Sequence, residues 1–188
     1  MKKLLQRIAI AAMTVTASLT SAALDVGSEL PNFAANDDTG EIWTASNYIG
    51  KKNLVVYFYP AAMTGGCTAQ ACSYRDFSTN LDEADAIVVG VSGDSVKGLS
   101  LFKEAHNLNF PLLSDPNGSI AQLFGVPTRA GGSLEREING DMHTFFRNLT
   151  TSRWTFVIGK DGKVIYKNEE VNAREDTATV LEVLKQHR

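Results

Sequence analysis

Residues 55–72 read VVYFYPAAMTGGCTAQAC and hold the two cysteines of the 188-residue chain, Cys67 and Cys72. The apolar and aromatic run Leu54–Tyr59 predicts a central strand that is covered on both faces. From Thr64 onward, apolar residues recur at roughly 3.6-residue spacing, which predicts a helix. These residues are Ala69, Ala71, Tyr74, Phe77 and Leu81. Both cysteines are therefore expected just past a strand, near the start of a helix.

The rest of the hydrophobic pattern alternates between strands and helices. A small hairpin is expected over Phe33–Thr44, around a cluster of turn-forming residues. Farther along, the pattern predicts a strand Ala86–Val91, a helix Val96–His106, a short strand Phe110–Leu113, a helix near Ile120–Phe124, a hairpin of Trp154–Ile158 and Val164–Lys167, and a helix Thr177–Gln186. This order predicts an α/β fold with a mixed central sheet flanked by helices.

The segment Pro127–Ser152 has no clear periodicity. It contains the pairs Gly131-Gly132 and Asn139-Gly140, which interrupt helices and strands. Three interpretations stay open for it: a lid, a surface for a partner, or a long connection.

The first residues of the chain have a different character from the rest. Three basic residues within the first seven positions precede an apolar stretch from Ile8 to about Leu19, and the small residues Ser21-Ala22-Ala23 follow. This is the pattern of a secretory signal peptide. We therefore expect residues 1–23 to be removed by cleavage after Ala22 or Ala23. Residues 24–188 would form one domain in the periplasm or outside the cell.

Composition limits the possible partners. The chain is 44% hydrophobic and 21% charged, as in globular proteins. Without the predicted signal peptide it keeps 15 basic and 21 acidic residues, a net charge of −6. A mildly acidic domain without clusters of Lys and Arg is a poor ligand for nucleic acids or for an anionic membrane surface. The sequence also contains no phosphate-binding loop or dinucleotide fingerprint, so no cofactor is expected.

The stretch around Cys67 has features that suit a reactive thiol. A cysteine near a helix N-terminus lies close to unpaired N–H groups and the positive end of the helix dipole, which favour the thiolate. Gly65-Gly66 allow the backbone to approach closely in the turn. Thr64 could cap the helix or turn its hydroxyl toward whatever approaches the sulfur. Pro60 removes a backbone donor and stiffens the end of the strand.

The spacing of the two cysteines bears on their role. On an intact helix, residues five positions apart have Cα atoms roughly 8–9 Å apart, beyond the ~7 Å that a disulfide spans without backbone movement. A Cys67–Cys72 bond would therefore require the first turns of the helix to unwind. This favours a reversible redox pair over a permanent structural disulfide. A metal site would need more Cys or His ligands at short spacing, so no metal is predicted.

The order of these residues resembles a known family. Pro60-Ala61-Ala62-Met63-Thr64-Gly65-Gly66-Cys67 reads P-x-x-x-T-x-x-C, which is similar to the active-site signature of the peroxiredoxins, thiol peroxidases with a thioredoxin-like fold. The stretch from Tyr57 to Asp76 resembles specifically the Q-type subfamily, also described as bacterioferritin-comigratory-protein-like. The likeness continues through FPLLSDPNG (110–118), FGV (124–126) and RWTFVIGKDGKV (153–164). It covers most of the chain from about Gly27.

The resemblance implies a role for five residues. Cys67 would be the peroxidatic cysteine and Cys72 the resolving cysteine that condenses with it to an intramolecular disulfide. Thr64 would hydrogen-bond the peroxide, and Pro60 would shield the oxidised sulfur. Arg153 would stabilise the thiolate and the charge that develops during the displacement.

The chain also departs from the family pattern. Gln70 stands where an acidic residue is common, and Gly65-Gly66 where Pro-Gly is common. Arg75 is expected to pair with Asp76 or a nearby Glu on a solvated helix face rather than to act in catalysis.

The predicted function is therefore an exported peroxidase for hydrogen peroxide or organic hydroperoxides. The resemblance implies re-reduction by a thioredoxin- or glutaredoxin-like partner and a monomer or weak homodimer. Two alternatives stay open. One is an exported thiol–disulfide oxidoreductase or redox sensor of the same fold, and the other is a binding module with a permanent Cys67–Cys72 disulfide that works through residues 127–152.

Overall fold

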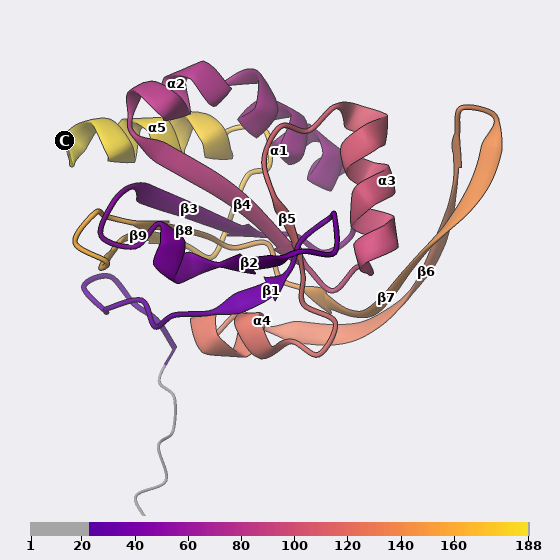
Figure 1. The fold of residues 1–188 in the computed structure, drawn as a ribbon, viewed down its shortest axis with the longest axis horizontal. Helices are drawn as coiled ribbons and strands as arrows, with labels where there is room; N and C mark the ends of the chain where they lie inside the picture. Colours follow the sequence, from indigo (N-terminus) through magenta and orange to yellow (C-terminus); the bar gives the residue numbers. More distant parts are fainter. Residues whose placement is uncertain (1–22, 188) are drawn as a thin grey trace, which may run out of the picture.

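The computed structural model describes residues 23–187, so the predicted signal peptide lies outside the described residues apart from Ala23. Five strands form the central sheet in the order β5-β4-β3-β8-β9 (Figure 1). They are β3 Asn53–Phe58, β4 Ala86–Ser92, β5 Leu112–Ser114, β8 Thr155–Ile158 and β9 Val164–Asn168. Strands β3, β4 and β5 run parallel, whereas β8 is antiparallel to both of its neighbours. The predicted α/β class with a mixed central sheet is confirmed.

Strand β3 lies at the centre because its sequence is apolar on both faces. Its side chains alternate between two cores, as the two-residue period of a strand requires. Val55 and Tyr57 pack on the face covered by α1 Gly65–Asp76, α2 Ser78–Glu83, α3 Val96–His106 and α5 Asp176–Gln186. Val56 and Phe58 pack on the opposite face against α4 Ser119–Phe124 and the N-terminal hairpin. That hairpin comprises β1 Ala34–Asn36 and β2 Ile42–Thr44 and leads into a short 3-10 helix, Ala45–Asn47.

The helix predicted from Thr64 to Leu81 is in fact two helices. Phe77 adopts φ −97° and ψ 17°, which interrupts the helix between α1 and α2. Its ring is 43% exposed rather than part of the buried stripe. The buried face of α1 comprises Cys67, Gln70, Ala71 and Tyr74. The prediction was wrong at Phe77 because spacing alone does not reveal that the chain changes direction there.

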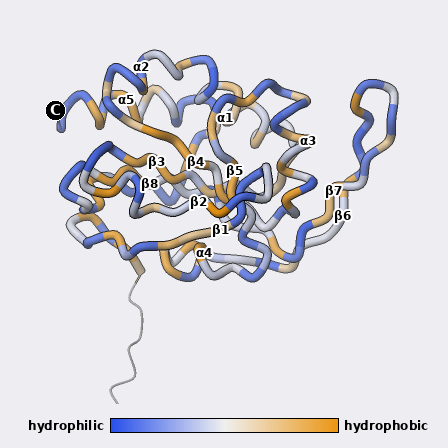
Figure 2. Tube along the Cα trace, in the orientation of Figure 1, coloured by the Kyte–Doolittle hydropathy of each residue, from blue (hydrophilic) through white to orange (hydrophobic). Residues whose placement is uncertain are grey.

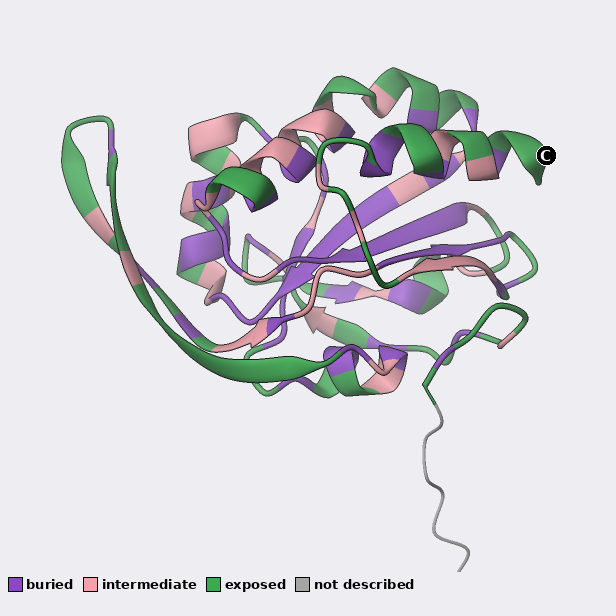
Figure 3. Cartoon of the chain, turned by 180° about the vertical axis from the view of Figure 1, so that it is seen from behind, coloured by how far each residue is buried: buried purple, intermediate pink, exposed green. Residues whose placement is uncertain are grey.

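Residues 127–152 form a long hairpin, with β6 Thr128–Ile138 and β7 Asp141–Thr151 paired antiparallel as a separate two-stranded sheet. Asn139 and Gly140 both have positive φ, 54° and 92°, as the tight turn of such a hairpin requires. A Cβ at Gly131 would lie 2.2 Å from the Arg147 carbonyl oxygen, so this position needs glycine. The hairpin curves away from the sheet (Figure 1), and its far end is mostly hydrophilic and mostly exposed (Figures 2 and 3).

Across residues 23–187, no helix has the length and apolar character that crossing a membrane requires.

Candidate active site

Cys67 lies in the first turn of α1, just past the end of β3. Cys67 is only 1% exposed, whereas Cys72, farther along the same helix, is half-buried. Both are free thiols. The backbone carbonyl of Thr64 accepts a hydrogen bond from the Thr68 N–H at 2.8 Å, so α1 is helical from its first turn. Cys67 therefore lies at the helix N-terminus, as predicted, in a buried position where the helix dipole acts with little screening.

Thr64 and Pro60 flank the turn that leads to Cys67. Thr64 occupies the N-cap position in an extended conformation, yet its side chain caps no helical N–H. Its hydroxyl instead donates to the Ala61 carbonyl at 2.9 Å, so the interpretation as a capping side chain is wrong. The hydroxyl oxygen keeps its lone pairs for a donor outside the chain. Pro60 is half-buried and borders, together with Arg153, a cavity of about 410 Å³.

Arg153 lies just before strand β8, far from Cys67 in the sequence, yet it contacts Cys67 directly. Its Nη2 donates to Cys67 Sγ at 3.2 Å across a sequence separation of 86 residues. The pairing of β8 with β3 explains this contact, because Thr155 lies opposite Tyr57 and the Trp154 carbonyl accepts from the Phe58 N–H. The residue before Trp154 therefore reaches the end of β3, where the cysteine turn begins. The structure thus brings Arg153 into contact with Cys67 and places it beside Pro60 at one cavity.

A chain of buried hydrogen bonds extends from Arg153 into the core. Arg153 Nη1 donates to Gln70 Oε1 at 2.6 Å, and Gln70 Nε2 donates to Asp176 Oδ2 at 2.7 Å. The hydroxyls of Tyr74 and Thr155 donate to the same Asp176 oxygen at 2.6 and 2.9 Å. Burial raises the pKa of the Asp176 carboxyl. Asp176 was not predicted as a site residue. The departure at Gln70 was the one signal that pointed to this region.

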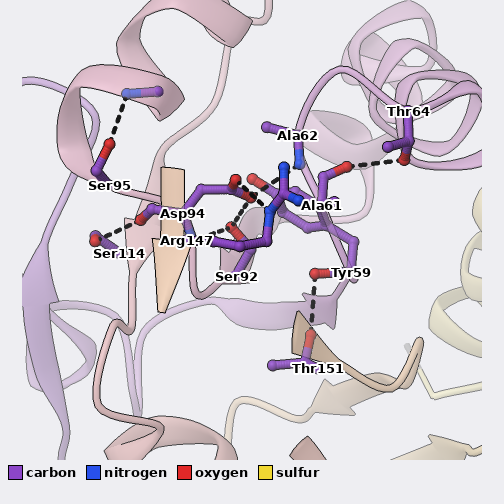
Figure 4. A network of polar contacts seen from close by, with 11 residues as sticks. Tyr59, Ala61, Ala62, Thr64, Ser92, Asp94, Ser95, Ser114, Arg147 and Thr151 are labelled. Carbon is purple, nitrogen blue, oxygen red and sulfur yellow. Dashed lines mark hydrogen bonds and ion pairs between the residues drawn. The ribbon is translucent and has the colours of Figure 1, made fainter. Parts of the chain in front are cut away.

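A second buried carboxylate, Asp94, holds the turn before Cys67 (Figure 4). Its Oδ2 accepts from the Ala62 N–H at 2.8 Å and from the Ser92 hydroxyl at 2.9 Å. Its Oδ1 accepts from Arg147 Nε at 2.9 Å, so β7 of the hairpin is tied to the same group. Asp94 follows strand β4, and the GD pair at 93–94 was a turn signal that could have drawn attention to it.

Arg75 lies near the second cysteine. It forms the predicted ion pair with Asp76 at 2.8 Å. The pKa of its guanidinium is raised, first by this hydrogen bond to Asp76 and also by Cys72. The ion pair was therefore predicted correctly, whereas the position of Arg75 beside Cys72 was not predicted.

Aromatic side chains form the wall behind Cys67. Tyr57 stacks on Tyr59 and on Tyr74, with ring centroids 5.5 and 4.9 Å apart. Burial raises the pKa of all three phenols well above its usual value, so each stays neutral near pH 7. The residues that the structure describes include no group of three or more His, Cys, Asp or Glu side chains suited to a metal ion. The chemical groups at this site are therefore a thiol, a guanidinium and a set of hydrogen-bond donors and acceptors.

A buried cysteine at a helix N-terminus, contacted by an arginine at the end of the central strands, is an arrangement suited to thiol chemistry. The chain belongs to the AhpC/TSA family, which it matches over residues 26–167. It is 36% identical over 162 residues to peroxiredoxin Bcp of Bacillus subtilis, covering 86% of this chain and 96% of the relative. It is 34% identical over 164 residues to peroxiredoxin Bcp of Escherichia coli, covering 87% and 97%.

Solved structures give the same result. Peroxidoxin BcpB from Mycobacterium tuberculosis aligns with a TM-score of 0.73 and 32% identity, covering 88% of this chain and 99% of that one. Peroxiredoxin Q from Xanthomonas campestris aligns with a TM-score of 0.69 and 28% identity, covering 89% and 99%. The predicted fold and the resemblance to Q-type peroxiredoxins are confirmed. The activity of this class is thiol-dependent reduction of peroxides.

Proposed function

We propose that Cys67 is the peroxidatic cysteine of this protein. Its thiolate attacks one oxygen of a hydroperoxide, the O–O bond breaks, and Cys67 becomes a sulfenic acid. The leaving oxygen takes a proton and departs as water or an alcohol. The observation that carries this proposal is the 3.2 Å contact between Arg153 Nη2 and Cys67 Sγ. This fixed positive charge favours the thiolate and the negative charge that develops on the peroxide oxygens.

Thr64 and Pro60 support this step. Because the Thr64 hydroxyl gives its proton to the Ala61 carbonyl, its oxygen is free to accept a hydrogen bond from the hydroperoxide O–H. Pro60 offers no backbone N–H and covers part of the approach to the sulfur, which limits access of water and of a second peroxide. A solved relative is described by its alkyl peroxide reduction activity, a bacterioferritin comigratory protein from Xanthomonas campestris, at 28% identity and TM-score 0.68. We therefore include organic hydroperoxides among the substrates.

Cys72 completes the proposed cycle as the resolving cysteine. Its thiolate attacks the sulfur of the Cys67 sulfenic acid, an S–S bond forms as the S–O bond breaks, and the departing hydroxide takes up a proton to become water. The Arg75 guanidinium lies beside Cys72. Since the two residues lie on one helix, α1 must unwind locally before the sulfurs can meet. An external dithiol, here a thioredoxin- or glutaredoxin-like protein, then reduces the disulfide and is itself oxidised.

We also propose that the protein works outside the cytoplasm, as the signal-peptide pattern of residues 1–23 implies, and that it is a monomer or weak homodimer. The mass of the mature protein recovered from the producing cells tests the first point, because cleavage after Ala22 or Ala23 removes a defined mass. The relatives named above are peroxiredoxins, and nothing in them favours the disulfide-exchange alternative.

Stopped-flow fluorescence of the reduced mature protein tests the mechanism, with Trp154 as reporter. Mixing with hydrogen peroxide or an alkyl hydroperoxide should give a fast, peroxide-dependent phase and a product two hydrogens lighter. Cys67→Ser should abolish the reaction. Cys72→Ser should keep the first, fast step and then accumulate sulfenic or over-oxidised Cys67. Peroxide consumption by Cys67→Ser at the wild-type rate would disprove the assignment of Cys67.

A further inference from the structure

The hydrogen-bond chain behind Cys67 contains a residue to which the proposed chemistry assigns no role. Asp176 lies at the start of α5, is 2% exposed, and makes no contact with either sulfur among the hydrogen bonds of the described residues. Three donors converge on its Oδ2, and one of them is the Gln70 amide. A buried carboxylate without a directly paired cation needs such donors, because burial penalises its charge.

The two ends of the Gln70 side chain allow one amide orientation. Arg153 has donors only, so the atom of Gln70 that faces Nη1 must be the oxygen. Asp176 Oδ2 also accepts from the Tyr74 and Thr155 hydroxyls, so the atom of Gln70 that faces it must be the nitrogen. The reversed amide would direct its N–H₂ group at the guanidinium and its oxygen at the carboxylate. Since Gln70 is fully buried, no water is at hand to relieve that mismatch.

We propose that Asp176 is a positioning residue: it fixes the amide of Gln70, and Gln70 in turn holds the Arg153 guanidinium with Nη2 directed at Cys67. One guanidinium nitrogen is fixed by Gln70 at 2.6 Å, and the planar group then directs the other to the sulfur at 3.2 Å. The amide also bridges a cation and an anion with its dipole aligned to both. This inference rests on the proposed role of Cys67 and assigns a further residue to the same site.

The position of Gln70 gives the arrangement a second consequence. Gln70 lies between Cys67 and Cys72 on α1, so unwinding of this helix for disulfide formation pulls its amide away from Asp176. The hydrogen bonds from Asp176 through Gln70 to Arg153 therefore favour the reduced, helical form in which Arg153 contacts the thiol. The same contacts are remade when the disulfide is reduced.

A pair of reciprocal substitutions tests the proposal. Gln70→Glu places a carboxylate against Asp176, and Asp176→Asn allows the Gln70 amide to reverse. Each should lower the second-order rate of the peroxide reaction by about tenfold or more, as loss of an orienting partner commonly does. The double variant Gln70→Glu/Asp176→Asn restores complementarity, because the Asn amide donates to a carboxylate that still accepts from Arg153. It should recover most of the rate.

Two further readouts separate positioning from electrostatics and from folding. The pH midpoint of thiolate formation, followed by ultraviolet absorbance, should rise in Asp176→Asn if the Arg153 guanidinium is no longer held against Cys67 Sγ. Simple removal of a nearby negative charge would lower it. Asp82→Asn and Gln122→Glu make the same chemical exchanges at exposed positions and should change neither readout. Circular dichroism confirms that each variant is folded.

Two results would overturn the proposal. One is a wild-type peroxide rate and midpoint in Asp176→Asn. The other is a double variant no faster than Gln70→Glu alone, since purely structural damage would add rather than cancel. Failure of the proposed function looks different: the wild-type protein itself would then react with peroxide no faster than an ordinary thiol. The midpoint of thiolate formation would still report whether Asp176 positions Arg153.

Discussion

Asp94 and Asp176 are both buried carboxylates close to Cys67, yet they are satisfied in different ways. Asp94 is fully buried and pairs directly with the Arg147 guanidinium, and it also accepts from the backbone N–H of Ala62. Asp176 has no directly paired cation among the described residues and reaches Arg153 only through the Gln70 amide. The first carboxylate holds the backbone of the turn before the cysteine. The second holds a side chain in contact with the sulfur.

The difference indicates that the two carboxylates have different roles. A direct buried ion pair fixes where segments lie, because either partner left alone is costly. Asp94 accordingly ties three segments together: the turn at Ala62, strand β4 and the hairpin at Arg147 (Figure 4). A relayed contact instead fixes an orientation, which affects the reaction more than the fold. We therefore expect changes at Asp94 to act mainly on stability and changes at Asp176 mainly on the reaction.

The largest expected effect is the loss of stability in Asp94→Ala. This substitution leaves the Arg147 guanidinium buried without its partner and removes the acceptor for the Ala62 N–H. Breaking a buried pair in this way costs about 3–5 kcal/mol in the free energy of unfolding. Arg147 Nη2 already lacks a hydrogen-bond partner among the described residues, so the site has no alternative acceptor in place. Urea unfolding monitored by Trp fluorescence measures the effect.

The double variant Asp94→Ala/Arg147→Met provides the control for this prediction. Because it removes the cation as well, it should regain part of the lost stability. If Asp94→Ala alone stayed within about 1 kcal/mol of the wild-type protein, the pair would not hold the hairpin and the turn as we infer.

How far the sequence predicted this molecule depends on the range of the contacts. Strands β3 and β4 were predicted because continuous apolar runs encode burial on both faces. The position of Cys67 was predicted from local order along the chain, and that of Arg153 from the motif around it. The residues that support them were missed because their partners are distant: 32 positions separate Ala62 from Asp94, and 106 separate Gln70 from Asp176. Neither pair has a periodic signature. Only the folded chain brings them together.

The hairpin β6–β7 shows the same limit at the level of an element. Its turn was marked by Asn139-Gly140, a local signal, but β6 is exposed on both faces over most of its length and so lacks the alternation that reveals a half-buried strand. Gly131-Gly132 was interpreted as a break, although Gly131 serves close backbone approach within β6.

The pH dependence of stability should show an effect of intermediate size that is specific to Asp176. Burial raises the pKa of this carboxyl, so the folded state holds a proton at pH values where the unfolded state has released it. The stability that the group contributes therefore falls as the pH rises through the window between the two pKa values. The free energy of unfolding of the wild-type protein, relative to Asp176→Asn, should decrease as the pH rises above about 4, the ordinary pKa of an aspartate.

The groups that face Asp176 do not obscure this measurement. Tyr57, Tyr74 and Tyr166 have pKa values raised by burial, so they remain neutral throughout the window. Urea unfolding of the two proteins at a series of pH values gives the difference directly. A difference that grew with pH would mean that hydrogen bonds to the ionised carboxylate outweigh its burial.

The smallest expected effect comes from the exposed part of the hairpin, which also contacts the turn before Cys67. Arg136 Nε donates to the Met63 carbonyl at 3.2 Å, one residue from the Ala62 N–H that Asp94 binds. This bond is exposed, so water can replace it when the side chain is removed. Arg136→Ala should therefore change the free energy of unfolding by no more than about 0.5 kcal/mol, and it should leave the peroxide rate close to that of the wild-type protein.

The matched control is Glu137→Ala, which shortens the neighbouring exposed side chain on the same strand. If Arg136→Ala weakened the protein or slowed the reaction far more than this control, the exposed part of the hairpin would hold the turn as firmly as Asp94 does. The two hydrogen bonds to this turn, from the Ala62 N–H to Asp94 and from Arg136 to the Met63 carbonyl, involve adjacent residues of the turn and differ mainly in burial. Comparing Arg136→Ala with Asp94→Ala therefore measures how much burial of a polar contact contributes to keeping the cysteine turn in place.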